Sequence, residues 1–262
     1  ITVLMISHEP EMVRLADRII QISAEEDAPC GSWHVTPPRT RPDEPPAIEC
    51  RNVTFSYAEG ATPILDDLTL SIPNGGFTLI TGPNGGGKST LLKHMNGLLQ
   101  ATSGEVRILG RTLDSKEARN AARTSVGLAF QHPERQLFES TVYDDIAFGP
   151  RNLGCTEDEV EERVRAAMAS VGLPFDDTYR RNPFMLSGGQ QRKAAIAGIL
   201  AMRTPILALD EPCAGLDARG RHELLELLCQ LNAEGTTIVM VTHDPRDLRL
   251  EGCQLISLAP DA

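Results

Sequence analysis

The sequence has few aromatic residues, few positive charges and no long apolar run. Phe, Trp and Tyr make up 4% of its 262 residues, and 25 Lys plus Arg stand against 36 Asp plus Glu, a formal net charge of −11. This acidic balance argues against a general affinity for nucleic acid or anionic lipid, so any phosphate site must be local. No apolar run approaches the roughly 18 residues that a membrane-spanning helix needs.

Cysteine is also sparse and shows no pattern. The six cysteines have no CxxC spacing; they are Cys30, Cys50, Cys155, Cys213, Cys229 and Cys253. The sequence therefore predicts neither a disulfide framework nor a zinc site, and we interpret the thiols as those of a reducing, cytoplasmic environment.

The chain begins with a stretch that occurs again near its other end. ITVLMISHEP at residues 1–10 aligns with TTIVMVTHDP at 236–245, which places His8 on His243. We expect residues 1–23 to be the C-terminal remnant of a preceding copy of the same domain, with His8 functionally silent here. Residues 24–46 contain six Pro and few aliphatic residues, which predicts a linker without order of its own.

Residues 47–258 follow the pattern of an α/β domain. Apolar strands alternate with helical segments, as in a parallel sheet covered by helices on both faces. The stretch Thr156–Gly172 has an N-cap, early acids and apolar residues on one face, which predicts an amphipathic helix. Two apolar runs end in polar residues, PILALD in Asp210 and TTIVMVTH in His243. Strand ends of this kind are where open α/β sheets bind ligands.

GPNGGGKST fits the phosphate-binding pattern GxxxxGK[ST] between a strand and a helix. Its glycines allow backbone N–H groups to face phosphates, and the helix N-terminus adds partial positive charge. Lys88 is expected to reach the β- and γ-phosphates, and the Ser89 hydroxyl to bind Mg²⁺. The predicted ATP-binding residues here are Gly82, Pro83, Asn84, Gly85, Gly86, Gly87, Lys88, Ser89 and Thr90.

Asp210 and Glu211 follow the PILALD strand. A pair of acids there suits two tasks: Asp210 holds Mg²⁺ through water, and Glu211 polarises the attacking water. Taken alone, such acids are as readily explained by solvation, and the phosphate-binding loop in the same chain favours the catalytic interpretation.

LSGGQ opens another helix, with Ser187, Gly188, Gly189 and Gln190 forming a second anion site without a lysine. One interpretation is that this loop covers the γ-phosphate of a nucleotide held by another copy, so that the active unit is a dimer. The other is a glycine-rich helix start without function, and the pentapeptide alone does not decide between them.

Together, GPNGGGKST, LSGGQ, ILALDEP, AGLD and VTHD resemble, in this order, the ATP-binding subunits of ABC transporters. The resemblance implies an α/β P-loop NTPase fold with a parallel-rich sheet flanked by helices. It also implies an N-terminal antiparallel β portion and an inserted helical subdomain at about 135–192. The roles it implies are adenine stacking for Tyr57, Mg²⁺ contact for Gln131, catalysis for Glu211, a contact across the dimer for Asp217 and a γ-phosphate switch for His243.

The stretches around FQHPERQLFESTVYDDIAFGPRNLG, AIAGILAM and DEPCAGLDARGR are further similar to ATPases of energy-coupling factor transporters, importers of vitamins and of cobalt or nickel ions. That resemblance implies a second ABC ATPase domain, a transmembrane T-component and a substrate-binding membrane component as partners, no nucleic acid, and a peripheral place on the cytoplasmic face of the membrane. Glu134 or Asp144 is the candidate for contact with T-component arginines. Departures from the pattern are Gly86, Cys213 and His132, whose side chains the phosphate cradle does not use.

Alternative functions are a conventional ABC transporter ATPase, a non-transport ABC protein of translation or DNA repair, and a degenerate structural subunit. The short Pro-rich linker and the absence of large insertions argue against the non-transport class, and the complete set of motifs argues against a degenerate subunit.

Overall fold

The computed structural model describes residues 33–35, 44–243 and 250–258. The predicted remnant at 1–23, with His8, and most of the predicted linker at 24–46 lie outside the described residues. The predicted domain at 47–258 is therefore described except for residues 244–249.

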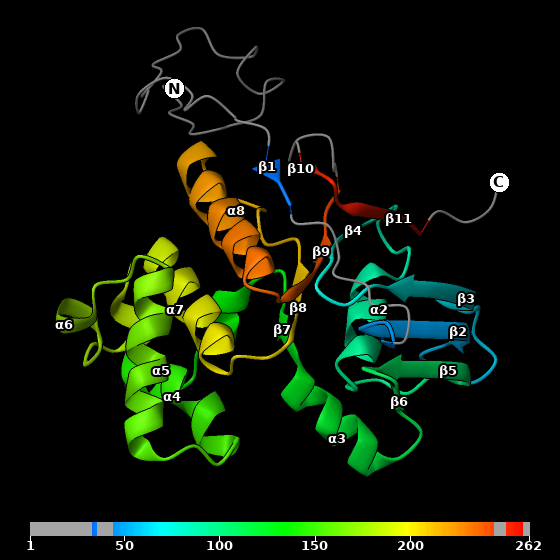
Figure 1. Ribbon diagram of the computed structural model, residues 1–262, viewed down its shortest axis with the longest axis horizontal. Helices are drawn as coiled ribbons and strands as arrows, with labels where there is room; N and C mark the ends of the chain where they lie inside the picture. Colours follow the sequence, from blue (N-terminus) through cyan, green and yellow to red (C-terminus); the bar gives the residue numbers. More distant parts are fainter. Residues whose placement is uncertain (1–32, 36–43, 244–249, 259–262) are drawn as a thin grey trace, which may run out of the picture. The chain divides into compact units, whose positions relative to one another are not determined.

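A parallel sheet forms the centre of the domain (Figure 1). In the described chain its strand order is β11-β4-β9-β8-β7, and every neighbouring pair is parallel. The strands are β4 (Phe77–Thr81), β7 (Val126–Ala129), β8 (Ile206–Asp210), β9 (Thr237–Val241) and β11 (Gln254–Ser257). β7, β8 and β9 are buried along their whole length, which explains their unbroken apolar sequences.

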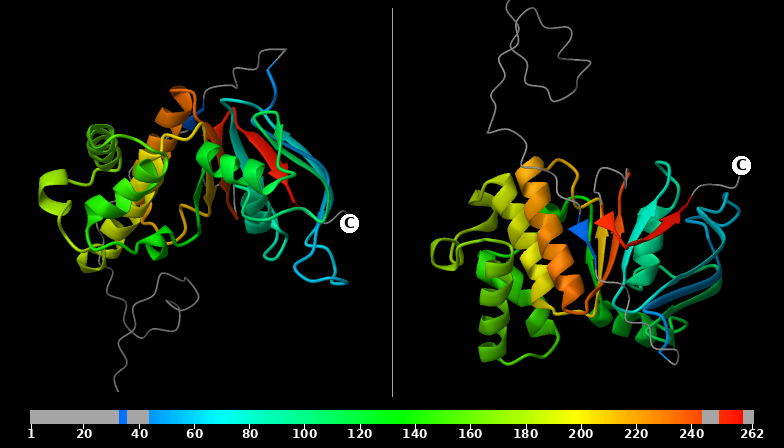
Figure 2. Two further views of the ribbon diagram at one scale, coloured as in Figure 1. Left: turned by 90° about the horizontal axis from the view of Figure 1, so that it is seen from below. Right: turned by 45° about the horizontal axis from the view of Figure 1, so that its top comes forward.

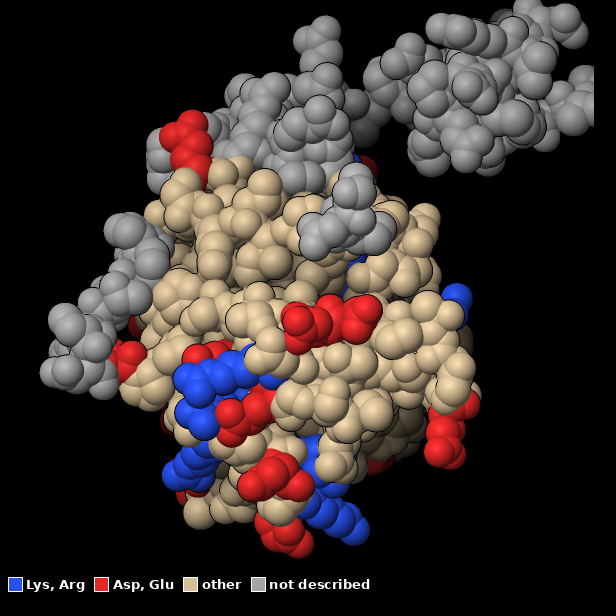
Figure 3. All heavy atoms as spheres, turned by 90° about the vertical axis from the view of Figure 1, so that its right-hand side faces the viewer, with Lys and Arg blue, Asp and Glu red and all other residues tan. Residues whose placement is uncertain are grey.

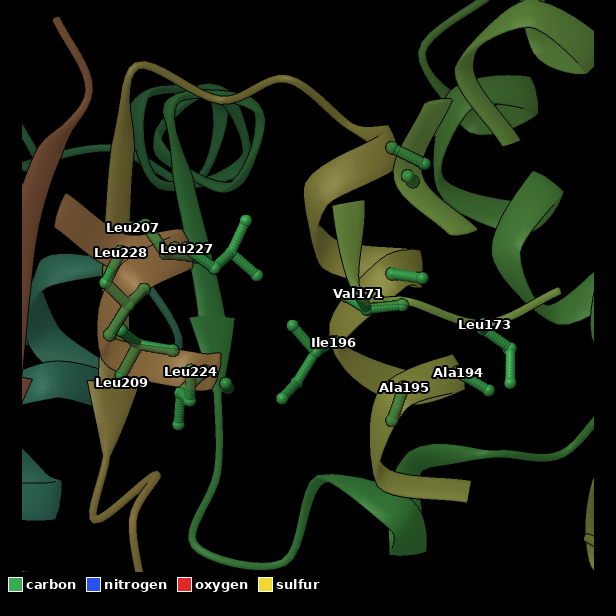
Figure 4. Close-up of a cluster of buried hydrophobic side chains, with 14 of the residues drawn as sticks. Val171, Leu173, Ala194, Ala195, Ile196, Leu207, Leu209, Leu224, Leu227 and Leu228 are labelled. Carbon is green, nitrogen blue, oxygen red and sulfur yellow. The ribbon is translucent and has the colours of Figure 1, made fainter. Parts of the chain in front are cut away.

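Helices cover this sheet on two faces because successive side chains of a strand point in opposite directions. Leu207 and Leu209 of β8 belong to the same buried cluster as α8 (Ala218–Ala233), whereas Ile206 and Ala208 belong to the cluster that holds α2 (Lys88–Met95). Figure 4 shows Leu207 and Leu209 beside the leucines of α8. The carboxyl ends of β4 and β8 thus lead directly to the predicted phosphate and acid residues.

An antiparallel sheet with the order β3-β2-β5-β6 packs on the α2 side. Its strands are β2 (Ile48–Phe55), β3 (Leu65–Ile72), β5 (Ser103–Ile108) and β6 (Arg111–Thr112), and α3 (Lys116–Ser125) follows. Figure 3, which views this side, shows Lys and Arg interspersed with Asp and Glu rather than a continuous basic surface. Two neighbouring ion pairs illustrate this, Arg51–Glu49 at 2.8 Å and Arg107–Glu105 at 2.9 Å.

Gly104 of β5 provides a stability prediction. It has φ +82°, and a Cβ there would lie 2.1 Å from the Asn52 carbonyl oxygen. Gly104→Ala is therefore expected to lower the free energy of unfolding by about 3 kcal/mol or more. The matched control is Gly60→Ala, with a similar φ of +78° and no described atom within 4 Å. It should cost only about 1 kcal/mol. Equal losses in urea unfolding would contradict the steric account.

A helical subdomain is inserted between β7 and β8 (Figure 2). It contains η1 (Pro133–Gln136), α4 (Val142–Asn152), α5 (Glu157–Ser170), α6 (Phe175–Thr178), η2 (Pro183–Met185) and α7 (Gly188–Ala201). The helix predicted at Thr156–Gly172 is confirmed as α5: Thr156 and Glu159 form a capping box, and Val160, Val164, Ala167 and Met168 are buried. None of the described helices combines the length and the apolar character needed to cross a bilayer.

Two short pieces of the predicted linker, residues 33–35 and 44–46, lie within the described structure. Trp33–His34 (β1) pairs in parallel with Leu250–Glu251 (β10), and the Val35 N–H donates to the Glu251 carbonyl at 3.1 Å. Val35 is buried, and the Trp33 ring lies 4.7 Å from the ring of His222 on α8. The expectation of a stretch without order is wrong at residues 33–35, which pair with β10 and pack against the neighbouring domain.

Candidate active site

The phosphate-binding loop leads from β4 into α2. Gly82, Gly85 and Gly87 have φ values of +153°, +80° and +85°, and a Cβ on Gly87 would approach Leu65 Cδ2 to 2.7 Å. Lys88 is 6% exposed, and its Nζ donates to the carbonyls of Gly82 at 2.8 Å and Pro83 at 2.9 Å. The loop thus fixes the ammonium group at its own centre.

The N-terminus of α2 is suited to an anion. Gly87, the N-cap, contributes no side-chain hydrogen bond to the helix, and the first turn carries no acid. The first backbone N–H groups of a helix need acceptors, and the helix dipole favours a negative one. A phosphate would supply both charge and acceptors at this point.

Tyr57 lies beside this helix start. The residue is 60% exposed, its hydroxyl is 3.1 Å from Thr90 Oγ1, and its ring packs edge-on against Phe55 with ring centroids 5.0 Å apart. An exposed aromatic ring held next to a phosphate site is suitable for stacking on a nucleobase. The predicted residues Tyr57 and Thr90 are therefore adjacent in space.

Asp210 ends β8 next to Ser89. Burial raises the pKa of the Asp210 carboxyl and the Glu211 charge adds to this, whereas the hydrogen bond with Ser89 and the Lys88 charge lower it. With Gln131 these residues offer hydroxyl, carboxylate and amide oxygens, the donors that Mg²⁺ prefers. The described chain holds no group of three or more His, Cys, Asp or Glu able to hold a metal. This set fits Mg²⁺ that is bound mainly through substrate phosphates and water.

Two other predicted residues, Gln131 and His243, contact the carboxylate of Glu211. Its Oε2 accepts a hydrogen bond from Gln131 Nε2 at 3.1 Å, and its Oε1 lies 2.6 Å from His243 Nε2. Its side chain is 12% exposed, and its backbone is left-handed, with φ +50°. A non-glycine residue in that conformation is strained, and such strain tends to occur at functional sites. The fold thus brings together residues that follow the carboxyl ends of β7, β8 and β9.

Asp217 and the LSGGQ residues are placed differently. Asp217 caps α8, because its Oδ1 accepts from the Gly220 N–H at 2.7 Å. Ser187 caps α7 and forms a capping box with Gln190. In Figures 1 and 2, α7 and α2 lie on different sides of β7, β8 and β9. The signature residues are therefore not brought to the chain's own phosphate loop.

One contact of the site was not predicted from the sequence. Arg192 on α7 donates through Nη1 to the Ala214 carbonyl at 2.8 Å and through Nη2 to the Pro212 carbonyl. Both acceptors lie between Glu211 and Asp217. The sequence shows only an arginine beside Gln191 and Lys193 in the first half of a helix, which indicates nothing about its acceptors.

The comparisons with known proteins agree with this geometry. The ABC transporter profile matches residues 65–214, more than half of the chain. The chain belongs to the ABC transporter family. The energy-coupling factor transporter ATP-binding protein EcfA2 of Ligilactobacillus salivarius is 46% identical over 210 residues, covering 77% of this chain and 72% of the relative.

Two solved structures extend the comparison. The structure of cbiO1 from Clostridium perfringens, described as part of the ABC transporter complex cbiONQ, has a TM-score of 0.68 at 37% identity over 77% of this chain and 80% of that one. The dimeric post-hydrolysis state of the cassette MJ0796, bound to ADP and Pi, has a TM-score of 0.68 at 30% identity, covering 76% and 89%. The predicted family and fold are confirmed, and the chain is an ABC-type ATPase.

Proposed function

We propose that this chain is the ATP-binding and ATP-hydrolysing subunit of an energy-coupling factor importer for a vitamin or for cobalt or nickel ions. The main support for this proposal is the position of Glu211, which contacts Gln131 and His243 at the end of β8, next to the phosphate-binding loop. The similarity to EcfA2 supports the importer class. On this proposal the chain works at the cytoplasmic face of the membrane.

Different residues of the chain have different roles in the proposed reaction. Lys88 and the α2 N-terminus bind the phosphates, and Tyr57 orients the base. Ser89, Gln131 and Asp210 would hold Mg²⁺, which neutralises charge on the phosphates when bound. Glu211 orients water and accepts its proton during in-line attack, while His243 supports the γ-phosphate. Tyr57 follows β2 of the antiparallel sheet, and the other groups of the chain's own site lie at or after the carboxyl ends of strands of the parallel sheet.

The signature residues act on a nucleotide of a second ABC domain. Gly188 and Gly189 have ordinary helical backbones, and an added Cβ would meet no described atom within 4 Å. Nothing in this chain's own packing requires glycine there. A ligand that approaches α7 from outside does explain small residues at its first turn, since its N-terminus can receive a phosphate. The partner proposed is therefore a second ABC ATPase domain, with Asp217 at the same contact.

Gly188→Ala tests this assignment. Alanine favours the helix and removes no contact, so the free energy of unfolding should stay the same or rise by about 0.5 kcal/mol. ATP turnover should nevertheless fall about tenfold, because a methyl group obstructs the approaching phosphate. Urea unfolding and steady-state phosphate release on the same preparation measure both quantities. Unchanged turnover would favour the interpretation of a glycine-rich helix start without function.

The proposed contact surface for the membrane partner follows Gln131 in the chain and contains Phe138 and Phe148. Phe138 and Phe148 are 57% and 46% exposed and pack edge-on, with ring centroids 4.9 Å apart. Exposed aromatic pairs of this kind are typical of protein contacts. Glu134 pairs with His132 at 3.1 Å and Asp144 with Arg151 at 3.1 Å. Both acids lie near the aromatic pair in the chain, and Glu134 or Asp144 remains the proposed partner of T-component arginines.

Serine at both Phe138 and Phe148 should weaken binding to the T-component at least tenfold, since truncated aromatic anchors cost more than 1 kcal/mol each. ATPase activity of the free chain should stay within about twofold, because neither ring reaches Glu211. Leu255→Ser, at a residue 58% exposed on β11, is the matched control. Co-purification with ribosomes instead of a T-component would overturn the importer assignment.

A further inference from the structure

Arg192 connects elements that the proposed reaction must move together. Arg192 lies in the first half of α7. Its guanidinium donates to the carbonyls of Pro212 and Ala214, on either side of Cys213. The acceptor turn is short and internally bonded, because the Ala214 N–H donates to the Glu211 carbonyl at 3.1 Å and the Leu216 N–H to the Cys213 carbonyl at 3.2 Å. Arg192 therefore holds the segment that joins Glu211 to Asp217.

A third element faces the same guanidinium. Burial lowers the pKa of Arg192, and the charge of Glu134 on η1 opposes that effect. Among the described residues, buried Glu134 Oε2 and buried Arg192 Nε both lack a hydrogen-bond partner. An unpaired carboxylate oxygen and an unpaired guanidinium N–H in one neighbourhood are a costly arrangement that a small shift of η1 can relieve. Arg192 thus stands between α7, the Glu211 turn and the segment that follows Gln131.

The packing of α7 couples the position of this helix to the Glu211 turn through Arg192. Ile196, one turn further along, points from α7 toward the strands (Figure 4) and is buried. Lys193 Nζ bonds Glu223 Oε2 of α8 at 3.0 Å, in a pair whose side chains are both partly exposed. A single ammonium–carboxylate bond in a partly exposed pair contributes little, whereas two bonds from one planar guanidinium to two carbonyls fix direction as well as distance.

We propose that Arg192 is a positioning residue: it transmits the seating of the signature helix to the Glu211 turn, so that turnover depends on what α7 contacts. When a phosphate from the second ABC domain meets the α7 N-terminus, the displacement reaches the carbonyls of Pro212 and Ala214 through one rigid group. The carboxylate of Glu211 is then brought to its working position. This inference rests on the proposed role of Glu211 and of the signature residues.

The test compares Arg192→Met, Arg192→Lys and the control Lys193→Met in the full chain. For Arg192→Met, kcat should fall about tenfold while KM for ATP stays within about twofold, because the phosphate loop is untouched and only Glu211 is misplaced. Arg192→Lys keeps the charge but not the planar fork, so its kcat should fall about threefold. Lys193→Met should stay within about twofold of wild type. Hydrogen exchange across 211–217 should be faster in Arg192→Met only.

The outcomes separate this inference from the proposed function. A wild-type chain without ATPase activity would contradict the proposed function itself. An active wild type with an unchanged kcat in Arg192→Met, or with a change confined to KM, would overturn the role of Arg192. If Arg192→Met fails to fold, the threefold loss of kcat in Arg192→Lys decides the matter, and an unchanged kcat there also overturns the proposal.

Discussion

Glu211→Gln should lower the rate of ATP hydrolysis about 1,000-fold while the affinity for ATP stays within about threefold. The amide has the size and shape of the carboxylate but cannot accept a proton from water, and general bases contribute factors of this order. The substitution also leaves the phosphate loop intact, since Glu211 is bonded to Gln131 and His243 rather than to Lys88. Single-turnover phosphate release and equilibrium nucleotide binding measure the two quantities.

The matched control for this substitution is Glu223→Gln. Glu223 lies on α8, pairs with Lys193 and Arg219, and has no contact with Glu211. Its neutralisation should change the hydrolysis rate by less than about twofold, as expected for an exposed ion pair. Near-normal hydrolysis in Glu211→Gln, with Glu223→Gln as reference, would remove Glu211 from the reaction.

Lys88→Ala should weaken ATP binding about 100-fold. The ammonium group is buried and fixed by the carbonyls of Gly82 and Pro83, so it meets the phosphates without further ordering. Charge-assisted hydrogen bonds of a buried cation are worth about 1.5–3 kcal/mol, which corresponds to a factor of roughly 10 to 150 in Kd. Titration with a fluorescent ATP analogue gives the affinity directly.

Lys116→Ala is the control for Lys88→Ala. Lys116 is exposed at the start of α3, and its removal changes the net charge by the same amount. If both variants lost affinity equally, the effect would be one of overall charge. If neither lost affinity, GPNGGGKST would not be the phosphate site.

The sequence predicted the parts of the site that lie within single segments. The turn from β4 into α2 requires glycine at Gly82, Gly85 and Gly87, and each has a positive φ. Asp210 and Glu211 follow a strand that is buried throughout, as the run PILALD indicated. These features depend on local geometry and periodicity, which a sequence carries directly.

The sequence could not predict contacts between segments. That Gln131 and His243 bond the same carboxylate depends on the order of β7, β8 and β9, and their motif roles came only from the family resemblance. The strained φ of Glu211 has no signal in residue type. Arg192 was missed for the same reason, because its acceptors are backbone carbonyls, and every residue has one.

Trp33–Val35 shows a limit of composition arguments. The stretch 24–46 that contains them is too poor in aliphatic residues to form a core of its own. Val35 is nevertheless buried against the domain, and its N–H donates to the Glu251 carbonyl. A segment without a core of its own can bury a side chain against a neighbouring domain, and the conformational entropy lost is then that of only a few residues. The predicted boundaries at 23 and 46 stay predictions.

The most direct test of the account is complementation between Lys88→Ala and Gly188→Ala chains. If the signature residues act across a dimer, each variant alone has two defective sites, and a mixed dimer joins an intact phosphate loop to an intact signature. An equal mixture should then recover up to about a quarter of wild-type ATP turnover, since half of the dimers are mixed and each has one repaired site. Turnover of the mixture equal to the mean of the two variants alone, with both folded, would contradict a composite active site.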